Sequence, residues 1–245
     1  MEQLRTYAKE LNIELSDLQL AQFRKYYDLL LEWNSFMNLT SITEYDEVLK
    51  KHFIDSISLI KAADTDLIRE ALLKGAEVSL LDVGCGAGFP SIPLKIAFPN
   101  LKVTMLDSLN KRIKFLNEVI GALELDNIEA LHGRAEDFAK PGLLREKFDI
   151  CVSRAVANLS TLSEYCIPYV KKDGVFVAYK SEEFKKEREN AGKAISVLGG
   201  EIEEVYEYTL PCTEFFRCLC VVRKKKNTPS KYPRKAGLPG KEPLK

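Results

Sequence analysis

The segment 78–90 restricts the possible folds of this chain more than any other: Val-Ser-Leu-Leu-Asp-Val-Gly-Cys-Gly-Ala-Gly-Phe-Pro. An apolar run ends in an acidic residue, Asp82, and three glycines follow at alternate positions, Gly84, Gly86 and Gly88. Such a run is typical of a buried strand. Glycines let the backbone approach a neighbour more closely than a residue with a Cβ atom could. The segment therefore predicts the first strand of a doubly wound sheet, followed by a turn that binds a nucleotide-like ligand.

Two classes of cofactor compete for this turn. The dinucleotide fingerprint has the form G-x-G-x-x-G, but the sixth position is Phe89 when counted from Gly84 and Ser91 when counted from Gly86. The pattern Asp-x-Gly-x-Gly-x-Gly is similar instead to the S-adenosylmethionine loop of Rossmann-like class I methyltransferases, whose cofactor has no pyrophosphate. The loop thus favours a methyltransferase over a nicotinamide enzyme, although a bare G-x-G can also mark an ordinary tight turn.

The charges of the chain are unevenly distributed. Its 245 residues, 46% of them hydrophobic, suffice for one large α/β domain or for one domain with an appendage. The net charge is zero, yet the tail 224–245 holds eight basic residues and one acidic residue, which leaves −7 on the remainder. This asymmetry indicates an anionic partner, with a solvated disordered end as the alternative. The prolines and glycines of the tail predict no regular structure there, and ordering only on RNA.

Cysteines, histidines and the first residues bear on metals and location. The six cysteines show no zinc-ligand spacing and the chain has only two histidines, so no metal site is expected. The chain begins Met-Glu-Gln without a basic and apolar leader, and no apolar run approaches the length of a membrane span. We expect a cytoplasmic protein without a membrane partner, whose cysteines are mostly small core residues.

Helical patterns fill the first seventy-odd residues. Ser16 and Gln19 form a predicted capping box ahead of an apolar repeat with helical spacing. A polar, turn-like stretch covers 34–43, and a second helical pattern covers 46–60. Because nothing marks a flexible linker, we expect residues 1–72 to form a helical cap packed on the main domain.

From residue 78 onward, strand-like and helix-like patterns alternate. Helices are predicted over about 108–123 and 182–198, the second ending at a Gly-Gly pair. Alternation of this kind predicts a Rossmann-like α/β core over 73–223, with a seven-stranded, mostly parallel sheet covered on both faces. The last two strands lack a helix between them and should pair as a hairpin. The predicted strands are 78–83, 102–107, 128–132, 148–152, 175–179, 202–208 and 217–222.

Polar residues follow the predicted strands at their carboxyl ends, where α/β sheets bind ligands. Asp107, after the second strand, could hold both ribose hydroxyls of a nucleoside or could cap the next helix. After the third strand, Glu136 could read the adenine edge or could simply place negative charge at a helix N-terminus. Together, these strand ends point to a nucleoside site more strongly than any one of them does.

The residue after the fourth strand, Arg154, is informative because other residue types are missing there. No Asn/Asp-Pro-Pro-aromatic run and no Pro-Cys pair follows this strand. Arginine is permanently charged and cannot act as a base, so it suits an acceptor atom with a free lone pair, such as guanine N7. Catalysis would then consist mostly of alignment. The alternative is a structural ion pair of Arg154 with Glu136 or Asp137.

Other charged residues near this edge could serve binding or packing. Basic residues that could bind phosphates, or could simply be solvated, are Lys111, Arg112, Arg134 and Arg217. His52 and Asp55 lie one helical turn apart in the predicted cap. We interpret these two as hydrogen-bonding groups that brace the cap against the glycine loop.

Motifs along nearly the whole chain carry a specific resemblance. They are Trp33-Asn34, Asn38-Leu39-Thr40, His52-Phe-Ile-Asp-Ser56, Asp82 to Pro90, Asp107-Ser-Leu-Asn-Lys-Arg112, Arg134-Ala-Glu136, Ser153-Arg-Ala155 and Tyr232-Pro-Arg-Lys-Ala-Gly237. In these the chain resembles the ribosomal RNA small-subunit methyltransferase G family, also called glucose-inhibited division protein B. The glycine loop is shared by many methyltransferases, whereas its combination with the cap and tail motifs is specific.

The resemblance implies a function and a set of site residues. It implies a bacterial, cytoplasmic and monomeric enzyme that transfers a methyl group from S-adenosylmethionine to N7 of one guanosine in the decoding-region loop of 16S rRNA. The substrate would be the rRNA, the 30S subunit or its assembly intermediate. Arg154 would be catalytic as well as cofactor-binding. The other cofactor residues would be Gly84, Gly86, Gly88, Phe89, Asp107, Ala135 and Glu136. The RNA-binding residues would be Lys111, Arg112, Arg134 and Arg217.

Two other function classes compete with this interpretation. A nicotinamide-dependent oxidoreductase is disfavoured by the failed third glycine and by the lack of an evident proton donor. A non-catalytic RNA-binding or division-associated module would keep the fold without the chemistry. Binding of S-adenosylmethionine by the protein would separate these classes from a methyltransferase.

Overall fold

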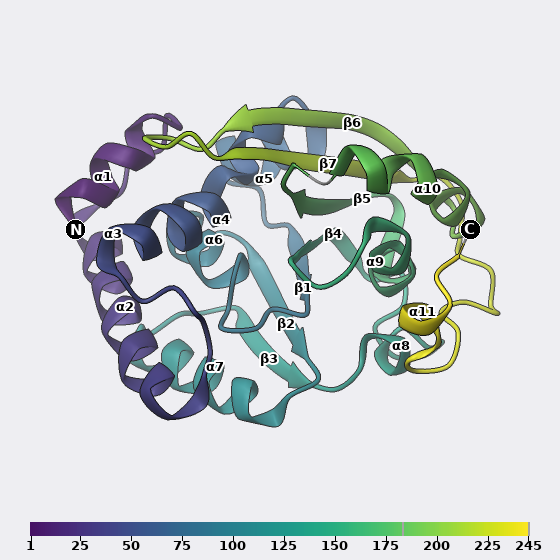
Figure 1. Cartoon of the computed structure of the whole chain (residues 1–245), viewed down its shortest axis with the longest axis horizontal. Coiled ribbons are helices and arrows are strands. Elements are labelled where there is room, and N and C mark those ends of the chain that lie inside the picture. The colour runs from purple at the N-terminus through teal and green to yellow at the C-terminus, as the bar shows by residue number, and fades with distance from the viewer. Residues whose placement is uncertain (183, 245) are drawn as a thin grey trace.

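A seven-stranded sheet forms the centre of the protein, in the order β3-β2-β1-β4-β5-β7-β6 (Figure 1). The computed structural model describes residues 1–182 and 184–244. Strands β1 to β5 pair in parallel, whereas β7 pairs antiparallel with both β5 and β6, so the predicted mostly parallel sheet with a terminal hairpin is confirmed. The strands are β1 Ser79–Val83, β2 Lys102–Asp107, β3 Ile128–His132, β4 Phe148–Arg154, β5 Val170–Lys180, β6 Gly200–Thr209 and β7 Phe216–Lys224.

The strand order places a ligand site at the carboxyl ends of the central strands of this sheet. After β1 the chain adds β2 and β3 on one side, then crosses back and adds β4 and β5 on the other. Carboxyl ends of strands at such a reversal leave a crevice open to ligands. Strand β4 extends to Arg154, beyond its predicted end, and therefore carries this side chain directly into the crevice.

Apolar side chains alternate between two cores, one on each face of the sheet. In β1, Leu80 belongs to the core shared with the N-terminal residues, α6 and α7, whereas Leu81 belongs to the core shared with α9 and α10. This period of two is what a strand covered on both faces requires. The helices of this region are α6 Ser91–Ala97, α7 Asn110–Ala122, α8 Ala135–Phe138, α9 Leu159–Cys166, η3 Ile167–Tyr169 and α10 Phe184–Val197. The predicted helix 182–198 agrees with α10, except that residue 183 lies outside the described residues.

The N-terminal cap consists of the long helix α2 and several shorter helices, of which α1 and α3 lie with α2 along the left of Figure 1. The predicted capping box is present, because Ser16 accepts from the amide of Gln19 while the Gln19 side chain accepts from the amide of Ser16. The predicted turn over 34–43 is wrong in its first part, since α2 continues to Met37 before Asn38 turns left-handed. The elements are α1 Glu2–Lys9, α2 Asp17–Met37, α3 Tyr45–Val48, the π-helix η1 Leu49–Ile54, α4 Asp55–Ile57, the 3-10 helix η2 Ser58–Ala62 and α5 Asp66–Leu73.

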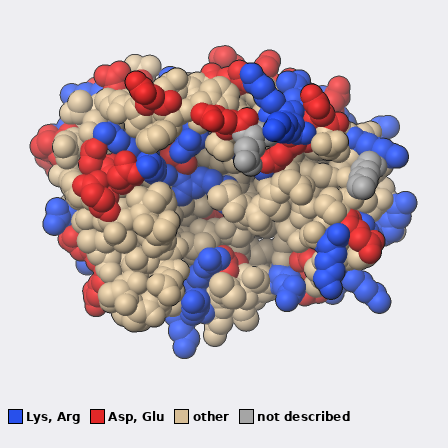
Figure 2. Space-filling view, in the orientation of Figure 1, with Lys and Arg blue, Asp and Glu red and all other residues tan. Residues whose placement is uncertain are grey.

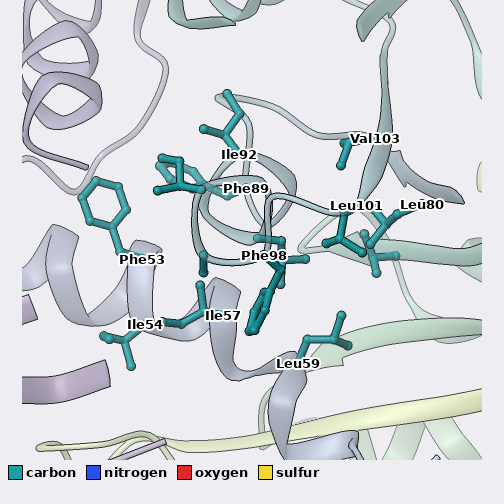
Figure 3. Packing of buried hydrophobic residues seen from close by; sticks show 14 of the residues in the cluster. Phe53, Ile54, Ile57, Leu59, Leu80, Phe89, Ile92, Phe98, Leu101 and Val103 are labelled. Carbon is teal, nitrogen blue, oxygen red and sulfur yellow. The ribbon is translucent and has the colours of Figure 1, made fainter. Parts of the chain in front are cut away.

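Buried apolar contacts join the cap to the core. Figure 3 shows Phe53 and Ile57 from the cap beside Phe89, which follows the glycine loop, and Phe98, which follows α6. The rings of Phe53 and Phe89 lie 6.2 Å apart between centroids, and Phe53 is fully buried. Burying one such side chain contributes about 1.5–3 kcal/mol. These N-terminal residues and the residues around the sheet belong to one hydrophobic cluster.

The tail is ordered on the core, which corrects the prediction of an irregular segment that orders only on RNA. Residues 228–244, here called the C-terminal strap, run beside α8 and α9 and contain the short helix α11 Leu238–Lys241 (yellow in Figure 1). Arg145 donates a 2.7 Å hydrogen bond to the carbonyl of Tyr232 in the strap. The prediction failed because such backbone carbonyls carry no signature in the sequence.

Within the described part of the chain, none of the helices combines the length and apolar character that crossing a bilayer would take.

Candidate functional site

The three glycines of the loop serve two purposes. All three have positive φ, +74° at Gly84, +60° at Gly86 and +95° at Gly88, where glycine is favoured. A Cβ atom on Gly84 would lie 2.5 Å from Val156, and one on Gly88 would lie 2.5 Å from Ile92, so these two glycines permit protein packing. A Cβ atom on Gly86 would meet no atom of the described residues within 4 Å. The middle glycine therefore faces open space that a ligand can fill.

Asp82 holds the loop from beneath. Its side chain is fully buried, and its Oδ2 accepts from the hydroxyl of Ser91 at 2.6 Å and from the Ser91 amide at 3.3 Å. Its Oδ1 has no hydrogen-bond partner among the described residues. Burial raises the pKa of this carboxyl group to about 7. Asp82 thus joins the end of β1 to the start of α6 and fixes the shape of the glycine loop between them.

A cavity of about 610 Å³ lies at the carboxyl ends of β1, β2, β3 and β4. It brings together most of the predicted cofactor residues from four separate strand ends. Gly88 is the exception, because it packs against Ile92 and Tyr26 rather than lining the cavity. The predicted residues in the lining are Gly84, Gly86, Phe89, Asp107, Ala135, Glu136 and Arg154.

Asp107 ties the second strand to the glycine loop. Its Oδ2 accepts from the amide of Gly86 and from the guanidinium of Arg112, each at 3.0 Å, and its Oδ1 accepts from the amide of Leu109 at 2.9 Å. The side chain thereby fixes the turn that leads into α7, but it does not cap the helix as the alternative prediction had it, because Leu109 precedes the first helical residue, Asn110. It also lines the cavity beside Gly86. Contact of Asp107 with a ribose stays a prediction.

Glu136 lines the cavity from the start of α8, with 6% of its surface exposed. Its Oε1 accepts a 2.7 Å hydrogen bond from the amide of Gly237 in the C-terminal strap. Gly240 from the same strap lines the cavity as well. This participation of the tail was not predicted from the sequence. The resemblance of the Tyr232–Gly237 motif to the tail motif of the family was a signal for it.

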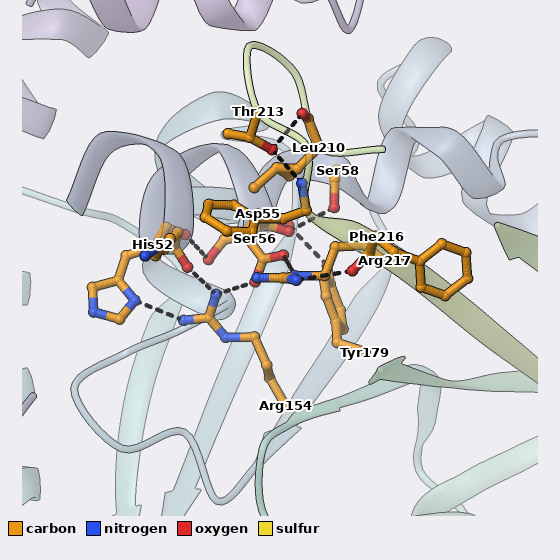
Figure 4. A network of polar contacts seen from close by, with 12 residues as sticks. His52, Asp55, Ser56, Ser58, Arg154, Tyr179, Leu210, Thr213, Phe216 and Arg217 are labelled. Carbon is orange, nitrogen blue, oxygen red and sulfur yellow. Dashed lines mark hydrogen bonds and ion pairs between the residues drawn. The ribbon is translucent and has the colours of Figure 1, made fainter. Parts of the chain in front are cut away.

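Arg154 forms part of a buried ion network between the core and the cap (Figure 4). Its Nη1 donates to Oδ2 of Asp55 at 2.6 Å, and Nε of Arg217 donates to Oδ1 of the same carboxylate at 2.8 Å. The alternative prediction of an ion pair with Glu136 or Asp137 is therefore wrong. The sequence could not indicate the true partner, because Asp55 comes from the cap and the pair bridges 99 residues of chain.

His52 completes this network and is neutral. Burial, together with the nearby charge of Arg154, lowers the pKa of His52 to about 3. A guanidinium only donates, so Nδ1 of His52 accepts the 3.4 Å contact from Arg154, which leaves Nε2–H to donate to Thr40 at 2.8 Å. The imidazole stacks on the ring of Phe89 at 4.4 Å between centroids. The prediction that these residues brace the cap against the glycine loop is confirmed for His52, whereas Asp55 braces the cap against β4 and β7 through Arg154 and Arg217.

A second cavity, of about 630 Å³, adjoins the first across the segment 154–157, which lines both. Arg217, Tyr179 and Lys180 form part of its wall. Val156, whose surface is 40% exposed, lies between the glycine loop and this second space. Two ligands, one in each cavity, would come together at Arg154.

The four predicted RNA-binding residues lie in different settings around the two cavities. Lys111 is exposed and donates to the carbonyl of Met37, and Arg134 is exposed at the rim of the first cavity. Arg112 and Arg217 instead form ion pairs inside the site, with Asp107 and Asp55. Figure 2 shows a hollow near the middle of this face with basic side chains on its margin. RNA contact by the four residues stays a prediction.

Comparisons with known proteins agree on one family. A family model described as rRNA small subunit methyltransferase G matches residues 19–215. A ribosomal RNA small subunit methyltransferase G from Lachnoclostridium phytofermentans is 55% identical over 236 residues, which are 96% of this chain and 94% of that protein. The protein of the same name from Staphylococcus aureus is 51% identical over 244 residues, covering 100% of this chain and 98% of its relative.

A solved structure extends the likeness to the fold. The structure of TYW2 from M. jannaschii in complex with AdoMet matches this chain with a TM-score of 0.51 and 15% sequence identity. The match covers 65% of this chain and 74% of that chain. At this level of identity the likeness concerns the arrangement of the sheet and its helices.

Proposed function

The chain belongs to the rRNA small subunit methyltransferase G family, and we propose that it transfers a methyl group from S-adenosylmethionine to N7 of one guanosine in 16S rRNA. The observation that carries this proposal is the fixed guanidinium of Arg154, held by Asp55 where the two cavities adjoin. A permanent cation at that point favours an acceptor that needs no deprotonation.

The first cavity fits S-adenosylmethionine. Open space over Gly86 admits a ligand against the backbone, and the carboxylates of Asp107 and Glu136 stand at two further strand ends as hydrogen-bond acceptors. When bound, the cofactor supplies an electrophilic methyl group on a sulfonium. Phe89 and Val156 present apolar surface to the cavity, which keeps water away from the site of transfer.

The second cavity fits the acceptor base. Guanine N7 carries an in-plane lone pair and no proton, so the site requires orientation rather than a general base. His52 is unsuited to the role of base because both of its ring nitrogens are engaged, with Arg154 and Thr40. Nη1 of Arg154 donates both to Asp55 and to the carbonyl of Lys51, and Nη2 contacts Nδ1 of His52, so the guanidinium is held rigidly and offers a donor to an acceptor atom of the base.

The substrate form, location and assembly state belong to the same proposal. The substrate is the rRNA in the 30S subunit or in an assembly intermediate, and the enzyme works as a monomer in the cytoplasm, where ribosomal subunits assemble. Exposed lysines remain on the tail for phosphate contacts, at positions Lys225, Lys226, Lys231 and Lys235.

The decisive experiment measures transfer of tritium from labelled S-adenosylmethionine to 16S rRNA and to 30S particles from cells that lack the enzyme, followed by nucleoside analysis. We expect 7-methylguanosine at one site. Cofactor binding without label in either RNA would contradict the proposed acceptor.

A matched pair of glycine variants tests the cofactor site. Gly86 and Gly75 both have positive φ, and a Cβ atom on either would meet no protein atom within 4 Å, but only Gly86 lines the cavity. Gly86→Leu should abolish calorimetric binding of S-adenosylmethionine, whereas Gly75→Leu should bear only the backbone strain and retain binding. Equal binding by the two variants would place the cofactor elsewhere.

A further inference from the structure

We propose that the C-terminal strap, residues 228–244, completes the adenine side of the cofactor cavity and positions Glu136 as the acceptor for the adenine amino group. The identity of the ligand rests on the proposed function, whereas the contacts of the strap do not. Gly237 is then a positioning residue, because it acts on the cofactor through Glu136.

The strap is fixed to α9 by a buried ion pair. Glu164 on α9 is fully buried, and its two carboxylate oxygens accept from Nε and Nη2 of Arg234 at distances of 2.6–3.1 Å. The backbone amide of Arg234 donates to the same carboxylate at 2.8 Å. A buried carboxylate requires a full set of hydrogen-bond donors, and the strap supplies these donors in one position only, so Glu164 selects that position of the strap.

Further hydrogen bonds hold the strap on both sides of this pair. Before it, Arg145 donates to the carbonyl groups of Pro229 and Tyr232 at 3.3 and 2.7 Å. After it, the hydroxyl of Thr161 donates to the carbonyl of Pro239 at 3.1 Å. Thr161 is itself part of the cavity lining, so the last of these bonds joins the strap to the wall of the cofactor site.

The strap meets the cavity wall at two points, through Glu136 at Gly237 and directly at Gly240. Gly237 precedes α11 with φ +83°, and its amide donates to Oε1 of Glu136 at 2.7 Å. One turn later Gly240 lines the cavity, close to the hydroxyl group of Tyr165. This geometry gives one oxygen of Glu136 to the strap. The other oxygen, Oε2, accepts no hydrogen bond from any described residue and is left for a donor in the cavity, such as the amino group of adenine.

The test compares S-adenosylhomocysteine with its deaminated inosine analogue, which carries a carbonyl oxygen in place of the adenine amino group. The full chain should bind the adenine form about tenfold or more tightly, since a hydrogen bond to a charged acceptor is lost with the inosine form. In Glu136→Gln the amide oxygen still accepts from Gly237, so its NH₂ group must face the ligand. This variant should therefore prefer the inosine form.

Removal of the strap then separates positioning from simple contact. The shortened chain ends at Ser230 and carries Glu136→Gln, together with Glu164→Gln to avoid an unpaired buried charge. Without Gly237, nothing orients the amide introduced at position 136, so this amide can rotate and accept a hydrogen bond from adenine. The preference of Glu136→Gln for the inosine form should disappear. When the same truncation is made with Glu136 intact, the affinity for S-adenosylhomocysteine should fall by about tenfold, a change of the size that the loss of roughly one hydrogen bond would cause. Lys235→Ala and Lys241→Ala, at exposed strap positions, are the controls and should bind both ligands as the parent chain does.

The outcomes distinguish this inference from the proposed function. If the full chain binds neither S-adenosylmethionine nor S-adenosylhomocysteine, the proposed function fails, and the inference fails with it. If the full chain binds them but Glu136→Gln keeps its preference for adenine, the inference alone is overturned. Should the shortened chain fail to fold, shown by loss of its cooperative thermal transition, the full-length Glu136→Gln variant decides by itself.

Discussion

Two segments outside the sheet, the N-terminal cap and the C-terminal strap, reach the same cavity by different means. The cap is held by fully buried apolar side chains such as Phe53 and Ile57 and by the carboxylate of Asp55 between two arginines. The strap is held by one ion pair, between Arg234 and Glu164, and by hydrogen bonds to its backbone, and its large apolar side chains Leu238 and Leu244 are only half-buried. The cap is therefore part of the cooperative fold, whereas the strap can detach at a lower free-energy cost.

The strongest test of this contrast removes the carboxylate that the cap contributes. Asp55→Ala leaves the guanidinium groups of Arg154 and Arg217 without their shared partner, and breaking such a buried pair costs about 3–5 kcal/mol. We expect a fall of that size in the free energy of unfolding in urea. The control is Asp46→Ala, which removes a more exposed ion pair with Lys50 and should cost about 1 kcal/mol or less. Equal losses in the two variants would show that the cap is not held by this network.

The second test asks whether the network aligns the acceptor. Arg154→Ala should lower kcat by about 100-fold, the effect expected when a reacting group loses its alignment. Its cofactor affinity should change far less, because the other lining residues stay in place. Arg154→Lys should not restore turnover, since a lysine cannot reproduce the fork that spans Asp55 and His52. Unchanged turnover in the alanine variant would limit Arg154 to a structural role.

The third test concerns the anchor of the strap. Arg234→Ala leaves the buried Glu164 without its guanidinium, and we expect a loss of about 2–3 kcal/mol, partly through local release. Hydrogen exchange should then accelerate in 228–244 while the amides of β1 and β4 stay protected. The double variant Arg234→Ala/Glu164→Gln should recover part of the loss. Uniformly faster exchange across the sheet would mean that the strap belongs to the cooperative core.

The smallest effect concerns the pH dependence of stability. His52 in the cap has its pKa lowered from 6.5 to about 3, so its contribution to stability is lost as pH falls through that range. Asp82 in the core has its pKa raised from 3.8 to about 7, so its contribution is lost as pH rises through that range. Between about pH 4 and 6.5 these two contributions oppose each other.

Single variants should uncover each contribution. Relative to the parent chain, stability of His52→Gln should fall more steeply with rising pH, and stability of Asp82→Asn should fall more steeply with falling pH. The change in slope should approach about 1.4 kcal/mol per pH unit. Urea unfolding at pH 4.5, 5.5 and 6.5 measures it, and the comparison between variants cancels the other titrating groups. Parallel curves for all three proteins would rule out the shifted pKa values.

The sequence predicted what depends on local pattern and missed what depends on distant partners. Alternation of apolar residues predicted all seven strands, and the rule that ligands bind at strand ends was enough to gather Asp107, Glu136 and Arg154 into one site. The ion partner of Arg154 could not be predicted from the sequence, because several carboxylates were possible partners. The strap was missed because a composition of lysine, proline and glycine is typical of disorder, whereas its anchors, Arg145 and Glu164, lie far away in the sequence.

The shared carboxylate of Asp55 has a consequence for the end of the reaction cycle. Two guanidinium groups and one carboxylate leave a permanent net charge of +1 beside the second cavity. Unmodified guanine is neutral, but under the proposed reaction the ring that leaves this cavity carries a positive charge. Like charges at short range repel, and more strongly where water is scarce. The residues that orient the substrate therefore also favour discharge of the product and discourage an already modified RNA from returning.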